Sequence, residues 1–383
     1  MKARCERGLS DFAHLCARVK HRDAPHSEAP NARAVDIRCC CVLFPAFGAD
    51  RAPAPRLLER AAVESSLATA TTHIRQYAFD TDPNTYFASE KNATKGDHFT
   101  LRFEGAVKVK ALTVLAARPN GDDALAAGAL EVSADGTKFE KVADFAKGKA
   151  TADLKEREVR AVRVRPTEDL KHPLVVREIA VDSAPRVSVF RYPVEFTIDV
   201  TDAPELREWT EKVVRVCERE YPMICDILAS DDFRPPTQIR MSMKASYTGV
   251  AMAGGNRITG SVKYFKERPN DIGAMVHETA HCVQSYRARG LPGWLVEGIA
   301  DYVRFWKFEP GTAGRVNPQR AAFDASYRTT AAFLAFVCDK YDPHAVTKLN
   351  AQLRAGRYDV NVWKALTGKT VEELNKEWRE TLR

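Results

Sequence analysis

The sequence lacks any apolar run that approaches the roughly 18 residues a membrane-spanning helix needs. It also lacks a long Lys/Arg block interleaved with aromatic residues, although its formal net charge is +7. Residues 1–60 carry 11 Lys and Arg against 7 Asp and Glu, so +4 of this charge lies in one short segment. These absences argue against a membrane span and against nucleic-acid binding.

Cysteine is absent from residues 42–216, and no two cysteines form a CxxC pair, which argues against a cysteine zinc site. Cys217 and Cys225 lie eight residues apart on one expected helix, about 12 Å along its axis, too far to pair with each other. We interpret these two, with Cys282 and Cys338, as buried apolar side chains whose disulfide state the sequence leaves open.

Residues 1–62 show no sustained helical or strand periodicity, and we interpret them as a leader that is disordered or contains a signal. At 38–49 a basic residue, a short apolar stretch and small residues form the three parts of a secretory signal. Because this segment lies far from Met1, we hypothesise a downstream start, for example at Val35. We expect a secreted or periplasmic protein; Met1 or Lys2 at the mature N-terminus would refute the displaced start.

Residues 63–185 alternate apolar and polar side chains in short runs separated by turn residues. This spacing is typical of an antiparallel β-sandwich rather than of alternating strands and helices. The expected strands are 98–103, 107–116, 129–134, 159–166 and 175–182.

Three segments of this region, FDTDPNTYFAS (79–89), LEVSADGTKFEKV (130–142) and REIAVDS (177–183), resemble the discoidin, or coagulation-factor type C, domain. The resemblance implies a jelly roll of the galactose-binding kind, with a glycan or cell-surface ligand at one end and often a structural calcium nearby. Asp82 and Asn84 offer oxygen atoms for such an ion. The family's tryptophan is replaced by Tyr86 or Phe87 here, so a spacer role is the alternative.

Residues 186–383 are mainly helical in pattern, which makes the whole chain a multidomain α+β protein. We expect a strand at 191–201 and a helix at 204–228. Strands at 239–243 and 258–265 follow, joined by a glycine-rich turn. Asp271 then offers N-cap chemistry to a helix that reaches about Arg287.

That last helix contains the segment HETAH. His277 and His281 are four residues apart, so both imidazoles project from one face and can bind one cation. Glu278 is placed to act as the general base on a metal-bound water. A purely structural histidine pair is the alternative.

A catalytic zinc usually has three protein ligands and one open position. Residues 294–306 form a second amphipathic pattern that offers Glu297 and Asp301 on one face. We expect Glu297 to be the third ligand and Asp301 to accept the second ring N–H of a ligand histidine. The reverse assignment, or a solvated acidic face, remains open.

Four segments together resemble the basic secretory protease family of plants and bacteria, which are zincin metallopeptidases: HETAHCVQ, GWLVEGIADYVR, SYRTTAAFLAFV (326–337) and LTGKTVEELNKEW (366–378). The resemblance covers about 187–383 and implies a secreted endopeptidase of peptides or proteins with one catalytic zinc ion.

The expected chemistry is attack of a zinc-bound water on a peptide carbonyl, with Glu278 as the base. Tyr327 is our candidate donor to the oxyanion, and a core position is its alternative. The strand at 258–265 offers a backbone edge to an extended substrate.

Two other functions compete with this one. A glycan- or surface-binding protein would carry an inactive zincin domain, but the four site residues are intact. A zinc aminopeptidase would need a carboxylate for the substrate's free amine, and GVAMAGGN (249–256) contains none.

Overall fold

The computed structural model describes residues 58–382 except Asp232 and Ser326. The expected leader therefore lies outside the described residues up to residue 57, and so does the signal-like segment at 38–49. Within the described part of the chain, none of the helices has the length and hydropathy needed to cross a bilayer.

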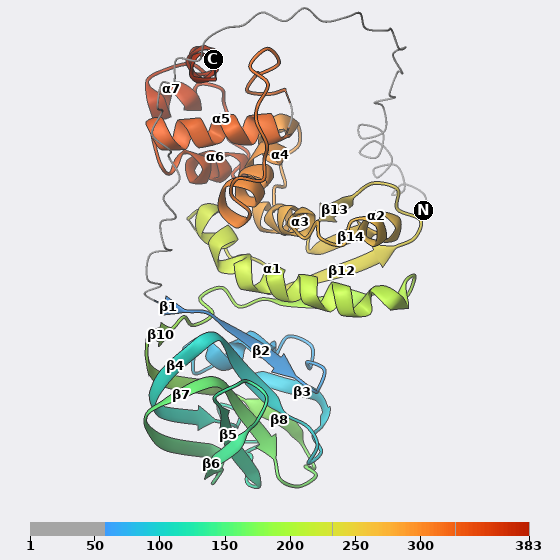
Figure 1. Ribbon diagram of the computed structural model, residues 1–383, viewed down its shortest axis with the longest axis vertical. Coiled ribbons are helices and arrows are strands. Elements are labelled where there is room, and N and C mark those ends of the chain that lie inside the picture. The colour runs from blue at the N-terminus through green and yellow to red at the C-terminus, as the bar shows by residue number, and fades with distance from the viewer. Residues whose placement is uncertain (1–57, 232, 326, 383) are drawn as a thin grey trace, which may run out of the picture. The chain divides into compact units, whose positions relative to one another are not determined.

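The N-terminal region is a β-sandwich, as its alternating pattern predicts (Figure 1). One sheet has the order β2-β4-β7-β5-β6, with β9 also paired to β4, and a second sheet joins β3 to β8. The elements are β1 (Leu58–Glu59), β2 (Ala61–Ser65), the 3₁₀ helix η1 (Arg75–Phe79), β3 (Phe87–Asn92), β4 (Phe99–Leu115), β5 (Gly128–Ser133), β6 (Glu140–Asp144), β7 (Lys149–Pro166), β8 (Pro173–Val176), β9 (Glu178–Ala184) and β10 (Arg186–Val187).

Strand β4 joins two segments that the sequence analysis had separated. Its odd-numbered residues face the core as far as Val109, and its even-numbered residues do so from Leu112. A register irregularity between Val109 and Ala111 causes this change, because one extra residue moves all following side chains to the other face. The single long strand therefore keeps an apolar face toward the core along its whole length.

The C-terminal region combines a four-stranded sheet with helices (Figure 1). Helices α1 and α3 contact each other and the sheet. The elements are β11 (Glu195–Asp199), the 3₁₀ helix η2 (Pro204–Leu206), α1 (Arg207–Ile227), β12 (Gln238–Lys244), β13 (Ala251–Gly254), β14 (Arg257–Ser261), α2 (Val262–Glu267), α3 (Gly273–Gln284), α4 (Gly293–Tyr302), the π-helix η3 (Val303–Phe308), α5 (Tyr327–Lys340), α6 (Ala345–Arg354), α7 (Val362–Thr367) and α8 (Val371–Thr381).

The small sheet corrects two expectations. Its order is β11-β12-β14-β13, and the glycine-rich turn joins β14 to β13, a strand that the sequence analysis missed. Strand β14 ends at Ser261, whose hydroxyl accepts from the Tyr264 N–H and starts helix α2. The interpretation of 258–265 as one strand with a free edge is therefore wrong, because β12 and β13 occupy both sides of β14.

Helix α3 also begins and ends differently from the expectation. Ile272 occupies the N-cap position, and Asp271 instead accepts from the Tyr264 hydroxyl and pairs with Arg304. The helix ends at Gln284 because Ser285 adopts a left-handed backbone conformation with a φ of 47°. Most of α3 is buried on every face, which leaves its two histidines as the partly accessible groups.

All four cysteines of the C-terminal region are buried and unpaired. Burial raises the pKa of the Cys217, Cys225 and Cys282 thiols to about 12. They are therefore neutral, apolar core groups.

Candidate metal centre

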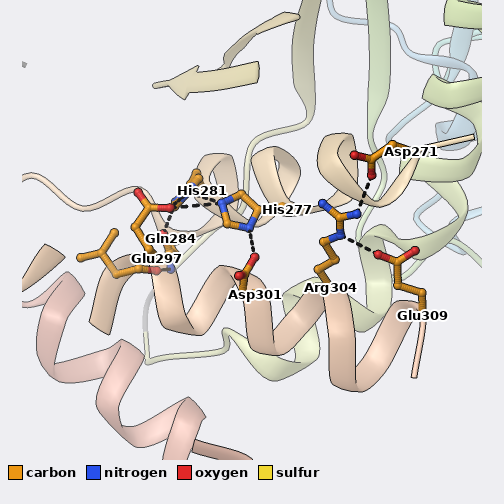
Figure 2. Close-up of polar contacts among 9 residues, drawn as sticks. Asp271, His277, His281, Gln284, Glu297, Asp301, Arg304 and Glu309 are labelled. Carbon is orange, nitrogen blue, oxygen red and sulfur yellow. Dashed lines mark hydrogen bonds and ion pairs between the residues drawn. The ribbon is translucent and has the colours of Figure 1, made fainter. Parts of the chain in front are cut away.

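Helix α3 supplies two imidazoles that face α4 (Figure 2). The ring centroids of His277 and His281 lie 4.8 Å apart, and the ring planes are almost perpendicular at 81°. Their side chains are only 12% and 16% exposed. The pair is thus sheltered but accessible to a small ligand.

Helix α4 brings Glu297 to the same point. The Oε2 atom of Glu297 lies 3.2 Å from Nε2 of His277 and 3.3 Å from Nε2 of His281. The two Nε2 atoms are 3.1 Å apart. Glycine at position 298 lets α4 pack closely against α5, since a Cβ there would lie 2.2 Å from Cγ2 of Thr330.

These spacings fit a single ion. Nitrogen and oxygen ligands lie about 2.0–2.2 Å from a tetrahedral zinc, which puts neighbouring ligand atoms roughly 3.4 Å apart. The three observed separations of 3.1–3.3 Å come close to that value. Two imidazoles and one carboxylate also form a donor set that a divalent metal accepts.

Asp301 lies behind the His277 ring rather than among the three converging atoms. Its Oδ1 is 2.7 Å from Nδ1 of His277, and its side chain is 7% exposed. A carboxylate here accepts the Nδ1–H and leaves the Nε2 lone pair directed at Glu297 and His281. Asp301 is therefore positioned to fix the tautomer of His277.

Gln284 occupies the equivalent position behind His281, and the sequence analysis missed it. Its Oε1 is 2.7 Å from Nδ1 of His281, and its Nε2 donates to the Val296 carbonyl at 2.9 Å. The signal available in the sequence was a polar residue three positions after His281, a spacing that places both side chains on one face of the helix.

The three converging groups together favour a positive charge. Burial alone lowers the pKa of His277, but hydrogen bonds with Asp301 and Glu297 outweigh it and raise the pKa to about 10. Burial raises the pKa of Glu297, but its hydrogen bonds with both histidines hold the pKa well below its usual range. A site that holds a proton so firmly suits a metal cation.

Glu278 lies next to this cluster and is only 8% exposed. Burial and the nearby Glu297 raise the pKa of its carboxyl group, whereas His277, His281 and a hydrogen bond with the Ala253 backbone oppose that shift. Ala253 belongs to β13, one of the two edge strands of the sheet. Glu278 thus connects helix α3 to an edge strand of the sheet.

Arg304 ties the start of α3 to the helix that follows Asp301 (Figure 2). Its guanidinium pairs with Asp271 on one side and with Glu309 on the other, and its side chain is 14% exposed. Such a largely sheltered, doubly paired guanidinium holds the two segments in a defined geometry.

Tyr327 begins α5, and its side chain is 48% exposed. It is therefore a surface residue rather than a core tyrosine. Its role as a donor to the oxyanion stays a prediction.

The β-sandwich has a separate acidic cluster near Asp80. Oε2 of Glu178 is buried with no hydrogen-bond partner among the described residues. Burial, followed by Asp80 and Asp82, raises the pKa of Glu178 to about 7. The two residues expected from the sequence, Asp82 and Asn84, hydrogen-bond to each other, whereas Asp80 and Glu178 were not predicted.

Three loop residues of the sandwich form a second cluster. The rings of His73 and Tyr86 stack with centroids 4.1 Å apart, and Nη1 of Arg118 donates to the Tyr86 hydroxyl at 2.9 Å. Burial, with a smaller effect of Arg118, lowers the pKa of His73. Of the two aromatic residues considered for this motif, Phe87 is buried and Tyr86 is partly exposed.

Family models match both regions of the chain. Residues 196–378 match the model described as peptidase of plants and bacteria. Residues 61–179 match the F5/8 type C domain. Both resemblances inferred from the sequence are thereby confirmed, and the C-terminal region carries the features of a peptidase family.

Solved structures similar to the chain include a carbohydrate-binding module from a family 31 glycoside hydrolase of Clostridium perfringens. The two are 22% identical with a TM-score of 0.28, and the match covers 32% of this chain and 92% of that one. A fucose-binding module of Streptococcus pneumoniae is 14% identical, with a TM-score of 0.27 and coverage of 32% and 92%. No curated protein matches the chain.

Proposed function

We propose, from the match of residues 196–378 to a peptidase family, that the chain is a zinc-dependent endopeptidase. The observation that carries this proposal is the convergence of His277, His281 and Glu297, whose ligand atoms lie within 4.8 Å of one another. Nδ1 of each histidine meets a hydrogen-bond acceptor, which leaves both Nε2 atoms for the ion. Zinc is the metal that such a nitrogen and oxygen set most often holds in hydrolases.

The residues of the chain divide the work of peptide hydrolysis. A zinc ion in this centre supplies Lewis acidity, which lowers the pKa of water and polarises a carbonyl. Glu278 takes up the proton of the attacking water on its carboxylate and delivers it to the leaving amine. Its burial next to two histidines keeps bulk water from competing for that proton.

An extended substrate is expected to pair with β13 rather than with β14. Strand β13 lies at the sheet edge, and its Ala253 contacts Glu278 through the backbone. Pairing with backbone groups holds a peptide without selecting its sequence, which suits an endopeptidase. An aminopeptidase needs the free amine of its substrate, whereas an endopeptidase does not. Cleavage of a peptide with a blocked amino terminus would therefore indicate an endopeptidase, and cleavage of free-amine dipeptides alone would indicate an aminopeptidase.

The decisive experiment measures zinc stoichiometry and cleavage of an unfolded protein substrate on the same preparations. Wild-type protein is expected to bind about one zinc per chain and to cleave the substrate, whereas Glu278→Gln is expected to bind zinc without cleaving. A wild-type chain that holds zinc and cleaves neither proteins nor blocked peptides would favour the binding protein with an inactive zincin domain.

For the β-sandwich we propose a structural calcium held with Asp80 and Glu178. The raised pKa of Glu178 means that the folded state without calcium binds a proton more tightly than the unfolded chain does. The protonated Glu178 therefore adds on the order of 1–3 kcal/mol to the free energy of unfolding. This stabilisation is fully present below about pH 4.5 and is lost as the pH rises through about 7. A calcium ion would offset this loss.

Calorimetry of the full chain tests the calcium proposal. In a chelator, the sandwich transition is expected to fall in temperature between pH 5.5 and 8, and calcium should raise it most at pH 8. Glu178→Gln should remove both the pH dependence and the response to calcium. If calcium stabilises this variant as much as it stabilises the wild type, Glu178 is not part of a calcium site.

The cluster formed by the stacked rings of His73 and Tyr86 and the guanidinium of Arg118 supports a glycan-binding role for the sandwich. A sugar binds through an aromatic surface together with a few fixed polar groups, and this cluster offers both. Arg118→Ala is expected to weaken glycan binding at least about tenfold, because the guanidinium also holds Tyr86 and Asp123 in place. A glycan array with exposed Arg160→Ala as the control tests this; equal binding by both variants would exclude the cluster.

A further inference from the structure

Gln284 is the last residue of α3 and has a side chain that is almost fully buried, at 1% exposure. Burying an amide is costly unless its polar atoms have partners. Here Oε1 faces Nδ1 of His281 at 2.7 Å, and Nε2 donates to the Val296 carbonyl at 2.9 Å. The amide thus links α3 to α4, the two helices that carry the converging residues of the metal centre.

The Val296 carbonyl determines which way this amide points. A carbonyl oxygen only accepts hydrogen bonds, so the amide must turn its NH₂ group toward Val296 and its oxygen toward His281. An amide oxygen likewise only accepts, so Nδ1 of His281 must carry the hydrogen. The His281 Nε2 atom then presents a lone pair to the metal position.

The backbone of Gln284 is fixed as well. Nε of Arg354 donates to the Gln284 carbonyl at 3.1 Å, and Nη2 donates to the Val283 carbonyl at 2.8 Å. The same guanidinium binds the Leu228 carbonyl through Nη1 at 2.9 Å. The end of α3 therefore cannot shift without breaking several hydrogen bonds, and the amide approaches His281 from a rigid base.

Val296 directly precedes Glu297, so a hydrogen bond to its carbonyl also holds the segment that carries the third ligand. We propose that Gln284 is a positioning residue of the metal centre: it selects the metal-binding tautomer of His281 and fixes the distance between His281 and Glu297. This proposal rests on the metal centre proposed above. It assigns His281 a neutral partner, in contrast to the carboxylate of Asp301 behind His277.

Metal affinity and a spectrum test the proposal without reference to activity. Full-length protein is titrated with zinc in competition with a chromophoric chelator, and with cobalt(II) for its visible absorption. Gln284→Met fills a similar volume without an acceptor and is expected to weaken zinc binding about 10–100-fold. Its cobalt spectrum should also change, because the His281 ring is free to rotate.

Two further variants separate positioning from packing. Gln284→Asn keeps the amide but is one methylene too short to reach both partners, so it should also lose affinity. Gln284→Glu restores an acceptor for His281 and should bind zinc more tightly than Gln284→Met. Thr279→Val is the matched control, because it removes a buried hydrogen bond of α3 to Met275 without touching a ligand partner.

The control should lower the melting temperature and leave zinc affinity and the cobalt spectrum as in wild type. Wild-type affinity in both Gln284→Met and Gln284→Asn would overturn the proposal, and if the first does not fold, the second decides alone. Equal losses in Gln284→Glu and Gln284→Met would overturn the selection of the His281 tautomer by Gln284, since an acceptor facing Nδ1 would then make no difference. A wild-type chain that binds no metal would refute the metal centre itself.

Discussion

Glu278→Gln is expected to lower kcat/KM for an unfolded protein substrate by about 10²–10⁴, the usual contribution of a general base. The amide is nearly the same size as the carboxyl group but cannot take up a proton. Zinc should remain at about one per chain, because Glu278 is not among the three converging ligands. The loss should therefore appear in activity and not in metal content.

The stability of this variant supplies a second expectation. Burial raises the pKa of Glu278, so the folded state without metal disfavours its charge, and a neutral glutamine removes that cost. The melting temperature of the metal-free protein should thus not fall, which excludes misfolding as the cause of inactivity. Exposed Glu372→Gln is the control with the same change of charge. Undiminished cleavage by Glu278→Gln would mean a contaminating protease or another mechanism.

Glu297→Gln is expected to have the largest effect on metal binding. It removes the only formally charged ligand of the three. Two unit charges about 4 Å apart interact by on the order of 4 kcal/mol at an effective dielectric of 20, so losing a charge in direct contact with a divalent ion is expected to weaken binding by at least roughly 10³-fold. Activity should fall in parallel, because the zinc site would be largely empty at ordinary zinc concentrations.

Asp301→Asn is the informative comparison for this prediction. Asp301 contacts Nδ1 of His277 and not the converging atoms, so its loss should weaken zinc binding only about 10–100-fold. Competition titrations on the two variants decide between the two assignments of the third ligand. If Asp301→Asn loses more affinity than Glu297→Gln, the metal is held by Asp301 and the assignment must be reversed.

Local spacing was enough to identify the three candidate ligands, although the two helices that carry them meet only in the folded protein. Residues four apart on a helix share a face whatever the rest of the fold does, so HETAH predicts a histidine pair and the next helix predicts an acidic pair. The partner of His281 could not be predicted in this way. The orientation of the Gln284 amide depends on its hydrogen bond to the Val296 carbonyl on another helix. Every residue has a backbone carbonyl, so the sequence cannot indicate which one accepts this bond.

The sheet shows the same limit. An alternating run indicates a strand but not its neighbours, so the edge was assigned to β14 although it belongs to β13. Strand β13 is only four residues long and rich in Ala and Gly, so it lacks the β-branched residues that identify a strand. Its place at the edge depends on how the chain returns after β12.

The amino-acid sequence by itself determined the two kinds of fold, the peptidase resemblance and the three candidate metal ligands, because periodicity and short spacings are local properties. Only the tertiary structure decided that Asp301 and Gln284 each take the Nδ1 side of one histidine, that β13 rather than β14 is an edge strand, and that Glu178 lies near Asp80. These outcomes depend on contacts between segments far apart in the chain, and their geometry exists only once the core has packed.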